Sequence, residues 1–425
     1  MPLTVSATGT RLERDGAFVP LVIDTIWAAF CDVSEDDWRV YLRVRRRQGF
    51  TAVVVTALPI VHDRTEGRAS RYPYARNADG TFDYTRVDDE YFETARRYVQ
   101  IARSEYGLEV VVAATWVNYL PGTWAKRLPP HVVMPPEVLR DHVARVADLF
   151  GPLGAIFSIS GDDGFDSPEA NALYHGVIDV LRERAPGSLV TAHSAPNAKV
   201  PDDVLDRLDF LVYQSGHDVE NQALVWEQAI TYAGRTPRKP IIDIEPPYEW
   251  HGMVNASGRW SQADVRRAAW ASVMSGAGAG IGYAAHGVWM WATTGGTFTF
   301  AHMSMEPATW VDAIALPGAR DMAFLGHLLK ARGLDRLDAA QHLLPNVPDP
   351  RFRAGASGDG DLIAVYFPYD RPLLVTDDVD ARSIEAWDLG ARAPLVPELT
   401  PVEGGTLVRP TGVLEDALVI AERRR

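Results

Sequence analysis

Carboxylates stand at or just beyond the ends of two short apolar runs of the chain. Residues 241–244 form an apolar run broken only by Asp243, and the run ends at Glu245. A strand of a parallel sheet is covered on both faces, so it reads as a continuous apolar run, and chemistry gathers where that run stops. Asp162 follows a second run, residues 155–159, after Ser160 and Gly161. Two such carboxylates suit glycoside hydrolysis, because one group must protonate the leaving oxygen while the other attacks or activates water.

Each of these two assignments has a structural alternative. Asp162 lies in a polar stretch where a turn or a helix cap would also use an aspartate. The alternative for Glu245 is one half of a buried ion pair, because such groups are seldom buried alone. Asp163 leaves open which aspartate is the acid. Asp243 would either raise the pKa of Glu245 by repulsion or bind an arginine.

Other hydrogen-bonding and aromatic side chains stand at the ends of further apolar runs. A single histidine is more often a satisfied core residue than a catalyst, and Asp24 is as well explained by a helix cap. Tryptophans fill cores, but their rings also stack on the apolar faces of sugars. Joint placement at strand ends favours a substrate site. The predicted substrate-binding residues are Asp24, Trp27, Trp116, His193, Gln214, His217, Tyr248, Glu249, His286 and Trp289.

These strand ends converge only if the strands share one sheet. Between Leu21 and Trp291 short apolar runs alternate with amphipathic stretches, which is typical of repeated strand–helix units. Eight such runs predict an α/β fold, the (β/α)8 TIM barrel, whose active sites form at the C-terminal ends of the strands. The runs are residues 21–23, 51–55, 110–114, 155–159, 188–190, 210–213, 241–244 and 281–285.

The segments outside this alternation predict three further features. Asp15 and Gly16 between strand-like residues indicate an N-terminal hairpin that closes the bottom of the barrel. The polar residues 59–87 are too many for a simple connection, so we expect them to shape the substrate site. Towards the C-terminus, short alternating runs separated by Asp, Gly and Pro predict a small antiparallel β-sandwich. We therefore expect two domains, residues 1–345 and 346–425.

The composition restricts the partners and the compartment. A formal net charge of -14 argues against nucleic-acid and anionic-membrane partners, because both recruit clustered Lys and Arg. The single cysteine, Cys31, excludes an internal disulfide and a cysteine-cluster metal site. The chain lacks the pattern of a signal peptide at its start, and no run approaches the roughly 18 apolar residues of a membrane span. We expect a cytoplasmic protein, and its oligomeric state stays open.

The motifs in their order resemble the apiosidase-like glycoside hydrolases, a family whose barrel domain was formerly of unknown function. The resemblance implies a TIM barrel with an aspartate acid/base and a glutamate nucleophile, which fall on Asp162 and Glu245, and often a β domain after the barrel. It also implies action on plant-type or other complex glycans. It spans roughly residues 12–331 and is carried by Asp15-Gly16, Ile23-Asp24-Thr25-Ile26-Trp27, Gln48-Gly49-Phe50, Gly161-Asp162, His193, Tyr213-Gln214-Ser215-Gly216-His217, Glu245-Pro246-Pro247-Tyr248-Glu249 and Trp289-Met290-Trp291.

We therefore predict a retaining, exo-acting glycosidase for an oligosaccharide or small glycoside. Glu245 attacks, Asp162 is the acid/base, and neither cofactor nor metal is required. A metal-dependent sugar isomerase or lyase is an alternative, because Asp, Glu and His at strand ends also bind divalent ions. A carbohydrate-binding protein without turnover is a second alternative, since a fold and a site shape do not guarantee catalysis.

Overall fold

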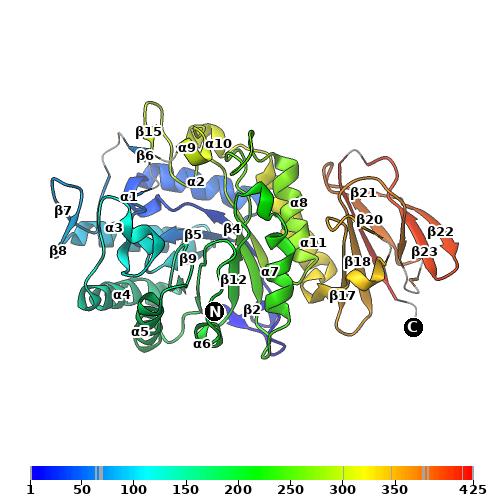
Figure 1. The fold of residues 1–425 in the computed structure, drawn as a ribbon, viewed down its shortest axis with the longest axis horizontal. Helices are drawn as coiled ribbons and strands as arrows, with labels where there is room; N and C mark the ends of the chain where they lie inside the picture. Colours follow the sequence, from blue (N-terminus) through cyan, green and yellow to red (C-terminus); the bar gives the residue numbers. More distant parts are fainter. Residues whose placement is uncertain are drawn as a thin grey trace.

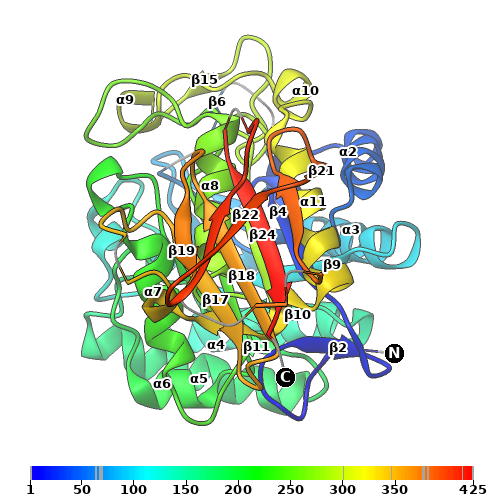
Figure 2. The same cartoon turned by 90° about the vertical axis from the view of Figure 1, so that its right-hand side faces the viewer.

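The computed structural model describes the chain in two adjoining parts, a barrel with its surrounding helices and a C-terminal group of strands (Figure 1). The barrel helices α7 (Leu224–Ala233), α8 (Gln262–Val273) and α11 (Gly318–Arg332) face the C-terminal strands. A view from the C-terminal side shows these strands in front of the barrel (Figure 2). The described residues are 2–62, 65–66, 70–299, 301–345, 347–375, 379–380, 382–413 and 415–423.

All eight apolar runs form strands of one parallel sheet, which confirms the predicted TIM barrel. The strand order is β11-β10-β9-β5-β4-β14-β13-β12. The two ends of this order meet through single hydrogen bonds, such as the one from the Asp209 amide to the Val190 carbonyl at 2.9 Å. The barrel is therefore nearly closed. Its strands are β4 (Leu21–Thr25), β5 (Ala52–Thr56), β9 (Glu109–Ala113), β10 (Ile156–Ser158), β11 (Val190–Thr191), β12 (Leu211–Gln214), β13 (Ile241–Glu245) and β14 (Gly280–Tyr283).

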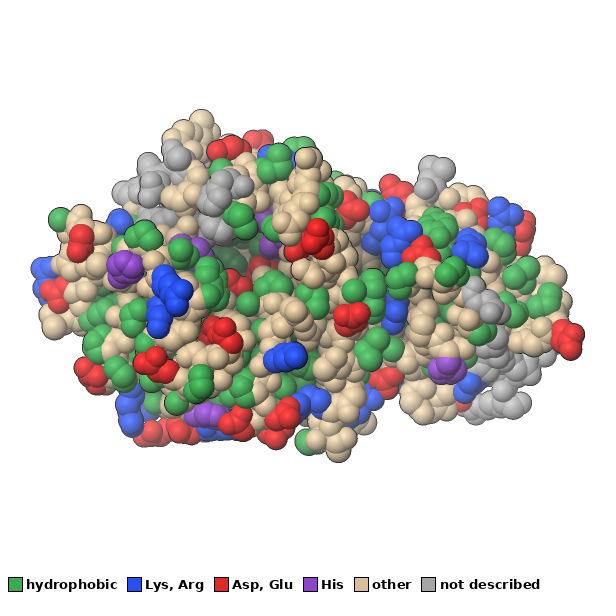
Figure 3. Space-filling view, viewed as in Figure 1, with side chains coloured by type: hydrophobic (Ala, Val, Ile, Leu, Met, Phe, Trp, Pro, Cys, Tyr) green, Lys and Arg blue, Asp and Glu red, His purple; other side chains and the backbone are tan. Residues whose placement is uncertain are grey.

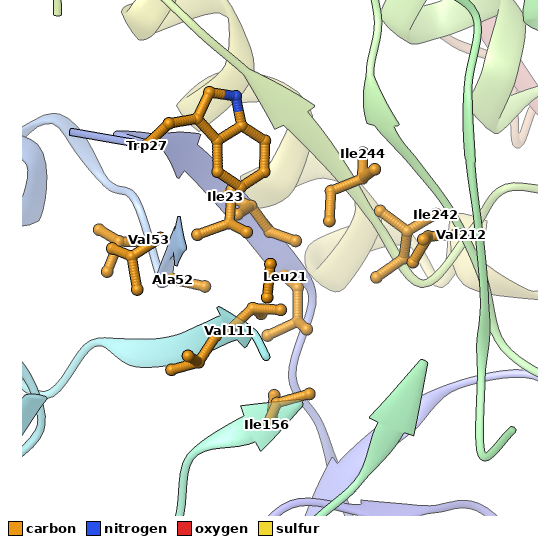
Figure 4. Packing of buried hydrophobic residues seen from close by; sticks show 14 of the residues in the cluster. Leu21, Ile23, Trp27, Ala52, Val53, Val111, Ile156, Val212, Ile242 and Ile244 are labelled. Carbon is orange, nitrogen blue, oxygen red and sulfur yellow. The ribbon is translucent and has the colours of Figure 1, made fainter. Parts of the chain in front are cut away.

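The barrel interior is filled by branched apolar side chains. Ile23 of β4 and Ile242 and Ile244 of β13 converge there with side chains from β9, β10 and β12 (Figure 4). All of these residues are at most 2% exposed. Because side chains alternate along a strand, the residues between them, such as Asp24 and Asp243, point outward to the helices.

The helices begin and end where local sequence signals place them. Ser34 accepts a hydrogen bond from the Asp37 amide, and Ser261 forms a full capping box with Asp264. None of the helices within the described residues is both long and apolar enough to cross a membrane. The helices are α1 (Ala29–Asp32), α2 (Glu35–Gln48), α3 (Asp89–Ser104), α4 (Pro136–Phe150), α5 (Pro168–Arg184), α6 (Asp202–Arg207), α7 (Leu224–Ala233), α8 (Gln262–Val273), α9 (Ala301–Ser304), α10 (Trp310–Ala313) and α11 (Gly318–Arg332).

The predicted hairpin lies at the bottom of the barrel. Asp15 and Gly16 form its two-residue turn with φ of 54° and 75°, the left-handed region that such tight turns require. Arg14 pairs with Glu109, the first residue of β9, and so ties the hairpin to the N-terminal ends of the barrel strands. The strands are β1 (Thr4–Val5), β2 (Leu12–Arg14) and β3 (Ala17–Phe18).

Long connections cover the opposite end. The segment after β5 contains β6 (Thr65–Glu66), which pairs with β15 (Thr297–Phe298) from the segment after β14. The same long segment then forms the pair β7 (Tyr74–Arg76) and β8 (Phe82–Val87). Segments far apart in the sequence are thereby joined over the C-terminal ends of the barrel strands.

The predicted antiparallel β region after the barrel is confirmed as two sheets. Their orders are β16-β17-β18-β24-β20-β21 and β19-β23-β22. The first strand, β16, lies before residue 345, and the division of the chain at that residue stays a prediction. The strands are β16 (Leu337–Ala339), β17 (Arg353–Ser357), β18 (Leu362–Phe367), β19 (Leu373–Val375), β20 (Glu385–Asp388), β21 (Ala393–Leu395), β22 (Glu398–Val402), β23 (Gly405–Arg409) and β24 (Ala417–Glu422).

A buried ionic network joins the two parts. Arg266 of α8 is 1% exposed and donates to Asp321 of α11 at 2.8 Å and to Asp416 beside β24 at 2.9 Å. Arg392 also pairs with Asp321, and the Tyr366 hydroxyl donates to Asp416. Because loss of one partner would leave buried charges unpaired, this network fixes the position of the β region against the barrel.

Candidate active site

A cavity of about 160 Å³ lies at the C-terminal ends of the barrel strands. One buried water needs about 15 Å³, so the space suits a larger polar ligand. In the space-filling view, a hollow with histidine side chains near its edge is visible on the barrel, and acidic and basic side chains are interspersed around it (Figure 3). The predicted residues that line the cavity are Trp27, Trp116, Asp162, Gln214, His217, Glu245, Tyr248 and Trp289.

The carboxylate of Glu245 is held in the cavity by hydrogen bonds from neighbouring side chains. Its Oε1 accepts hydrogen bonds from Gln214 Nε2 at 2.9 Å and from His217 Nε2 at 3.3 Å. Its Oε2 lies 3.4 Å from Nε2 of His193, which is buried behind it. Two donors therefore fix one oxygen and leave the other for chemistry.

The protonation of His217 follows from its neighbours. The backbone amide of Tyr248 donates to Nδ1 of His217 at 3.3 Å, so that nitrogen carries no proton and Nε2 carries it. Burial lowers the pKa of His217 to about 3, so the ring is neutral near pH 7. His217 is thus a fixed neutral donor to Glu245.

Burial also governs the charge state of Glu245. The side chain is enclosed by protein, and this desolvation raises the pKa of Glu245 above its usual value. The nearby His193 and Tyr248 side chains lower the pKa again, but by less than burial raises it. The carboxylate is therefore poorly solvated when ionised, which favours its reaction with an electrophilic carbon.

The neighbouring aspartates Asp162 and Asp163 point to different places. Asp162 has a left-handed φ of 56°, is half-buried and lines the cavity, and its carbonyl accepts a hydrogen bond from Trp124 Nε1 at 2.7 Å. Asp163 is 1% exposed, and its Oδ2 accepts from the Tyr174 hydroxyl at 2.8 Å. Of the two residues, only Asp162 lines the cavity.

Tryptophans form much of the cavity wall. The rings of Trp27 and Trp116 lie 4.8 Å apart, and His193 stacks on Trp27 at 5.6 Å. A Cβ on Gly161 would lie 2.0 Å from the Trp116 ring, so only glycine fits there. The glycine before Asp162 is thus a packing requirement of the aromatic wall.

Four of the predicted residues do not line the cavity, and two of them bind structural partners instead. Asp24 is fully buried between β4 and α2, where Oδ2 accepts from Arg45 Nε and the Tyr41 hydroxyl, both at 2.6 Å. Glu249 Oε2 accepts from the Tyr283 hydroxyl at 2.5 Å and from the Gly318 amide at 2.9 Å. Both carboxylates hold structural elements together, and the structure does not place them at the cavity.

The other two, His193 and His286, are buried behind residues that line the cavity. His193 supports Glu245 from behind, as described above. His286 is 0% exposed, with Nε2 2.8 Å from the Met305 carbonyl and Nδ1 accepting from Trp289 Nε1 at 3.3 Å. His286 therefore orients a cavity tryptophan and does not itself line the cavity.

Asp243 accepts hydrogen bonds from two serines and not from an arginine, which was one of the two expectations. The hydroxyls of Ser215 and Ser272 donate to its Oδ2 at 2.8 Å and 2.9 Å. Burial raises the pKa of Asp243 to about 7, and the charge of Glu245 adds a smaller increase. The side chain points to the helices, in line with the alternation along β13.

Several cavity residues were not among the predicted substrate-binding residues, and they lie in the long connections that follow the barrel strands. His62 belongs to the long polar segment expected to shape the site, whereas nothing in the sequence singles out His251 beyond its closeness to Glu245. Within the described ranges, no group of three or more His, Cys, Asp and Glu side chains is arranged to hold a metal ion. The additional cavity residues are Ile60, His62, Trp124, His251, Val254 and Met303.

Comparisons with known proteins agree with this architecture. A crystal structure of a glycoside hydrolase family 5 protein from Bacteroides vulgatus is 18% identical, with a TM-score of 0.80 over 99% of this chain and 93% of that one. A second solved structure, described as a glycoside hydrolase, gives the same identity and TM-score over 99% and 97%. A family 5 mannosidase from Rhizomucor miehei is 13% identical, with a TM-score of 0.54 over 78% and 98%.

These structural similarities show the fold. No curated protein sequence matches the chain. The family model of the apiosidase-like catalytic domain matches residues 8–335, which include every barrel strand and the whole cavity. The chain therefore belongs to the apiosidase-like family and is a glycoside hydrolase.

Proposed function

We propose that the protein is a retaining, exo-acting glycosidase of an oligosaccharide or small glycoside, with Glu245 as nucleophile and Asp162 as acid/base. One observation carries the proposal. Asp162 and Glu245 line a single cavity, and neutral donors fix Oε1 of Glu245, whereas Oε2 accepts no hydrogen bond among the described residues. The tryptophans around the cavity supply the flat apolar faces on which sugar rings stack.

In the first step, Oε2 of Glu245 forms a bond to the anomeric carbon as the bond to the leaving oxygen breaks. Asp162, protonated at this stage, gives its proton to the departing oxygen. The sugar is then held as an ester of Glu245. Gln214 and His217 keep their bonds to Oε1, so the carboxylate does not rotate during attack.

In the second step, water enters on the side from which the leaving group departed. Asp162, now ionised, takes a proton from that water as its oxygen attacks the anomeric carbon. The ester bond breaks, and Glu245 returns as a carboxylate. Two displacements at one carbon give a product with the configuration of the substrate.

The exo-acting mode is supported by the size of the cavity. Its volume of about 160 Å³ is small. Of the residues that line it, Trp124 and Met303 are the more exposed. A terminal sugar unit fits such a space better than the interior of a long polymer does. We therefore expect cleavage from a chain end.

The acid limb of the pH profile should lie above the ordinary range of a glutamate. Glu245 must be ionised to attack, and burial raises its pKa above the usual 4.5. Activity is then present above this raised pKa and is lost as the pH falls through it. A plot of kcat/KM against pH, with buffer controls for stability, measures the limb. A limb centred at or below pH 4.5 would contradict this account.

The function itself is tested by a panel of aryl glycosides that includes pentosides and deoxyhexosides. Wild-type protein should cleave at least one of them, and Glu245→Gln protein should not. Undiminished cleavage by the variant would remove Glu245 from the mechanism. Binding of sugars with no turnover over the whole panel would favour a carbohydrate-binding protein.

A further inference from the structure

Three histidine rings contact one another in a row beside Glu245. His217 and His251 are nearly parallel, with ring centroids 4.2 Å apart and an interplanar angle of 25°. His286 meets His251 edge-on at 4.9 Å. Burial lowers the pKa of all three below the usual value of histidine, so the rings are neutral near pH 7. Each neutral ring has one nitrogen that donates and one that accepts.

Two of these rings use both nitrogens inside the protein. His217 accepts from the Tyr248 amide at Nδ1 and donates to Glu245 from Nε2. His286 accepts from the Trp289 indole at Nδ1 and donates to the Met305 carbonyl from Nε2. Neither ring has a nitrogen left for a ligand.

His251 differs from both. Its Nδ1 lies 2.7 Å from the Gly252 carbonyl, and a carbonyl oxygen only accepts, so Nδ1 carries the proton. Nε2 therefore has a free lone pair, and no hydrogen bond to it is seen among the described residues. Among the three histidines, this is the lone pair left for a bound molecule, and the ring lines the cavity with Glu245 and His217.

The backbone holds the ring in this protonation state. The Gly252 amide donates to the Ser304 carbonyl at 2.7 Å, which anchors the peptide that follows His251. A Cβ at Gly252 would lie 2.7 Å from Met305 Cγ and 2.9 Å from the Ser304 backbone, so this close approach needs glycine. His217 on one side and the anchored peptide on the other leave the His251 ring little freedom to turn over.

We propose that His251 is a specificity-determining residue whose Nε2 accepts a hydrogen bond from a hydroxyl of the bound sugar. The inference rests on the proposed function, since it assumes that the cavity holds a sugar. It narrows the substrate class to glycosides with a free hydroxyl at the position facing His251. A deoxy or O-methyl sugar at that position has no proton to give.

The expected discrimination is large because the His251 side chain is buried in the cavity wall. A sugar without the hydroxyl would still displace water from Nε2 and leave the lone pair unpaired. Sites built to bind a substrate hydroxyl reject the analogue that lacks it much more strongly than apolar pockets reject an extra methylene. We expect wild-type protein to bind the matching monodeoxy sugar about 10- to 100-fold more weakly than the parent sugar.

Two substitutions separate this role from packing. His251→Phe keeps an aromatic ring against His217 and removes the acceptor. His251→Gln removes the ring and keeps a carbonyl oxygen that reaches the same region. His342→Phe, at an exposed histidine of the C-terminal part, is the matched control. Thermal unfolding of each protein shows whether it is folded.

Binding is measured by calorimetry in a Glu245→Gln background, with methyl glycosides of hexoses, pentoses and 6-deoxyhexoses and their monodeoxy counterparts. One monodeoxy sugar should bind about 10- to 100-fold more weakly than its parent in the background protein and in the His342→Phe control. In the His251→Phe protein that difference should fall to less than about threefold, and His251→Gln should restore part of it.

The deoxy penalty is the factor by which a monodeoxy sugar binds more weakly than its parent. An equal penalty in all of these proteins would overturn the proposal. The proposal would also fail if none of the sugars bound. The binding assay does not depend on turnover. If wild-type protein cleaves no aryl glycoside but the deoxy penalty disappears with His251→Phe, the proposed hydrolysis fails while the role of His251 stands. If cleavage occurs and the penalty is unchanged, only the role of His251 fails.

Discussion

Glu245→Gln protein is expected to lose at least about 10⁴-fold in kcat/KM, equal to roughly 5.5 kcal/mol of transition-state stabilisation. The reason is chemical, because an amide cannot form the ester that divides the reaction into two displacements. Glutamine has nearly the same shape, so the cavity around Gln214 and His217 should be preserved. Initial rates on the best aryl glycoside, with enzyme concentrations raised to detect slow turnover, measure the loss.

Glu249→Gln is the matched control for this experiment. Both donors to Glu249, the Tyr283 hydroxyl and the Gly318 amide, bind the same oxygen, so a glutamine carbonyl accepts both bonds. Burial raises the pKa of Glu249 to about 7, so the neutral form already exists near neutral pH. We expect kcat/KM within about threefold of wild type. Comparable losses of kcat/KM in both variants would contradict the assignment of Glu245 as the nucleophile.

Asp162→Asn protein should show a loss that depends on the leaving group. For alkyl glycosides, whose departing oxygen needs a proton, kcat/KM should fall by about 10² to 10⁴-fold. For 2,4-dinitrophenyl glycosides the phenolate leaves unaided, so kcat/KM should change little. Their kcat should still fall, because no base activates water in the second step. Rates for a series of leaving groups of graded acidity measure this dependence.

Asp163→Asn serves as the comparison for Asp162. An asparagine carbonyl would still accept the hydrogen bond from Tyr174, so any loss should be small and equal for all leaving groups. Thermal unfolding accounts for a change in folding. If the dependence on the leaving group appeared with Asp163→Asn and not with Asp162→Asn, the assignment of the acid/base would be wrong.

The barrel was predictable because its strands are buried on both faces. Such strands leave continuous apolar runs in the sequence, and all eight runs became strands. The turn at Asp15 and Gly16 was equally visible, because few residues other than glycine and asparagine or aspartate adopt left-handed φ. These features depend on local sequence alone.

The direction of a strand-end side chain was not predictable. Asp24 and Glu245 both end apolar runs, yet the first points to a helix and the second lines the cavity. The register between β12 and β13 shifts after Tyr213, so that Gln214 pairs with Glu245. A shift of one residue moves a side chain to the opposite face of the sheet, and no pattern in the sequence predicts such a shift.

Loop residues were missed for a related reason. His62 and His251 reach the cavity through loops whose course depends on distant partners, such as the Ser304 carbonyl that anchors Gly252. A histidine on a loop gives no signal of its own, because the same residue type occurs at many surface positions. The chemistry at the strand ends was therefore predictable in outline, while the walls of the site were not.

The most direct test of the central claim, that Glu245 attacks the sugar, is to trap the glycosyl-enzyme. A 2-deoxy-2-fluoro glycoside of a cleaved sugar, with a good leaving group, slows both displacements and lets the ester accumulate. Mass spectrometry of the intact protein should show the addition of one fluoroglycosyl unit, and peptide mapping should place it on Glu245. Attachment to another residue, or no adduct together with an inverted product configuration, would contradict the account.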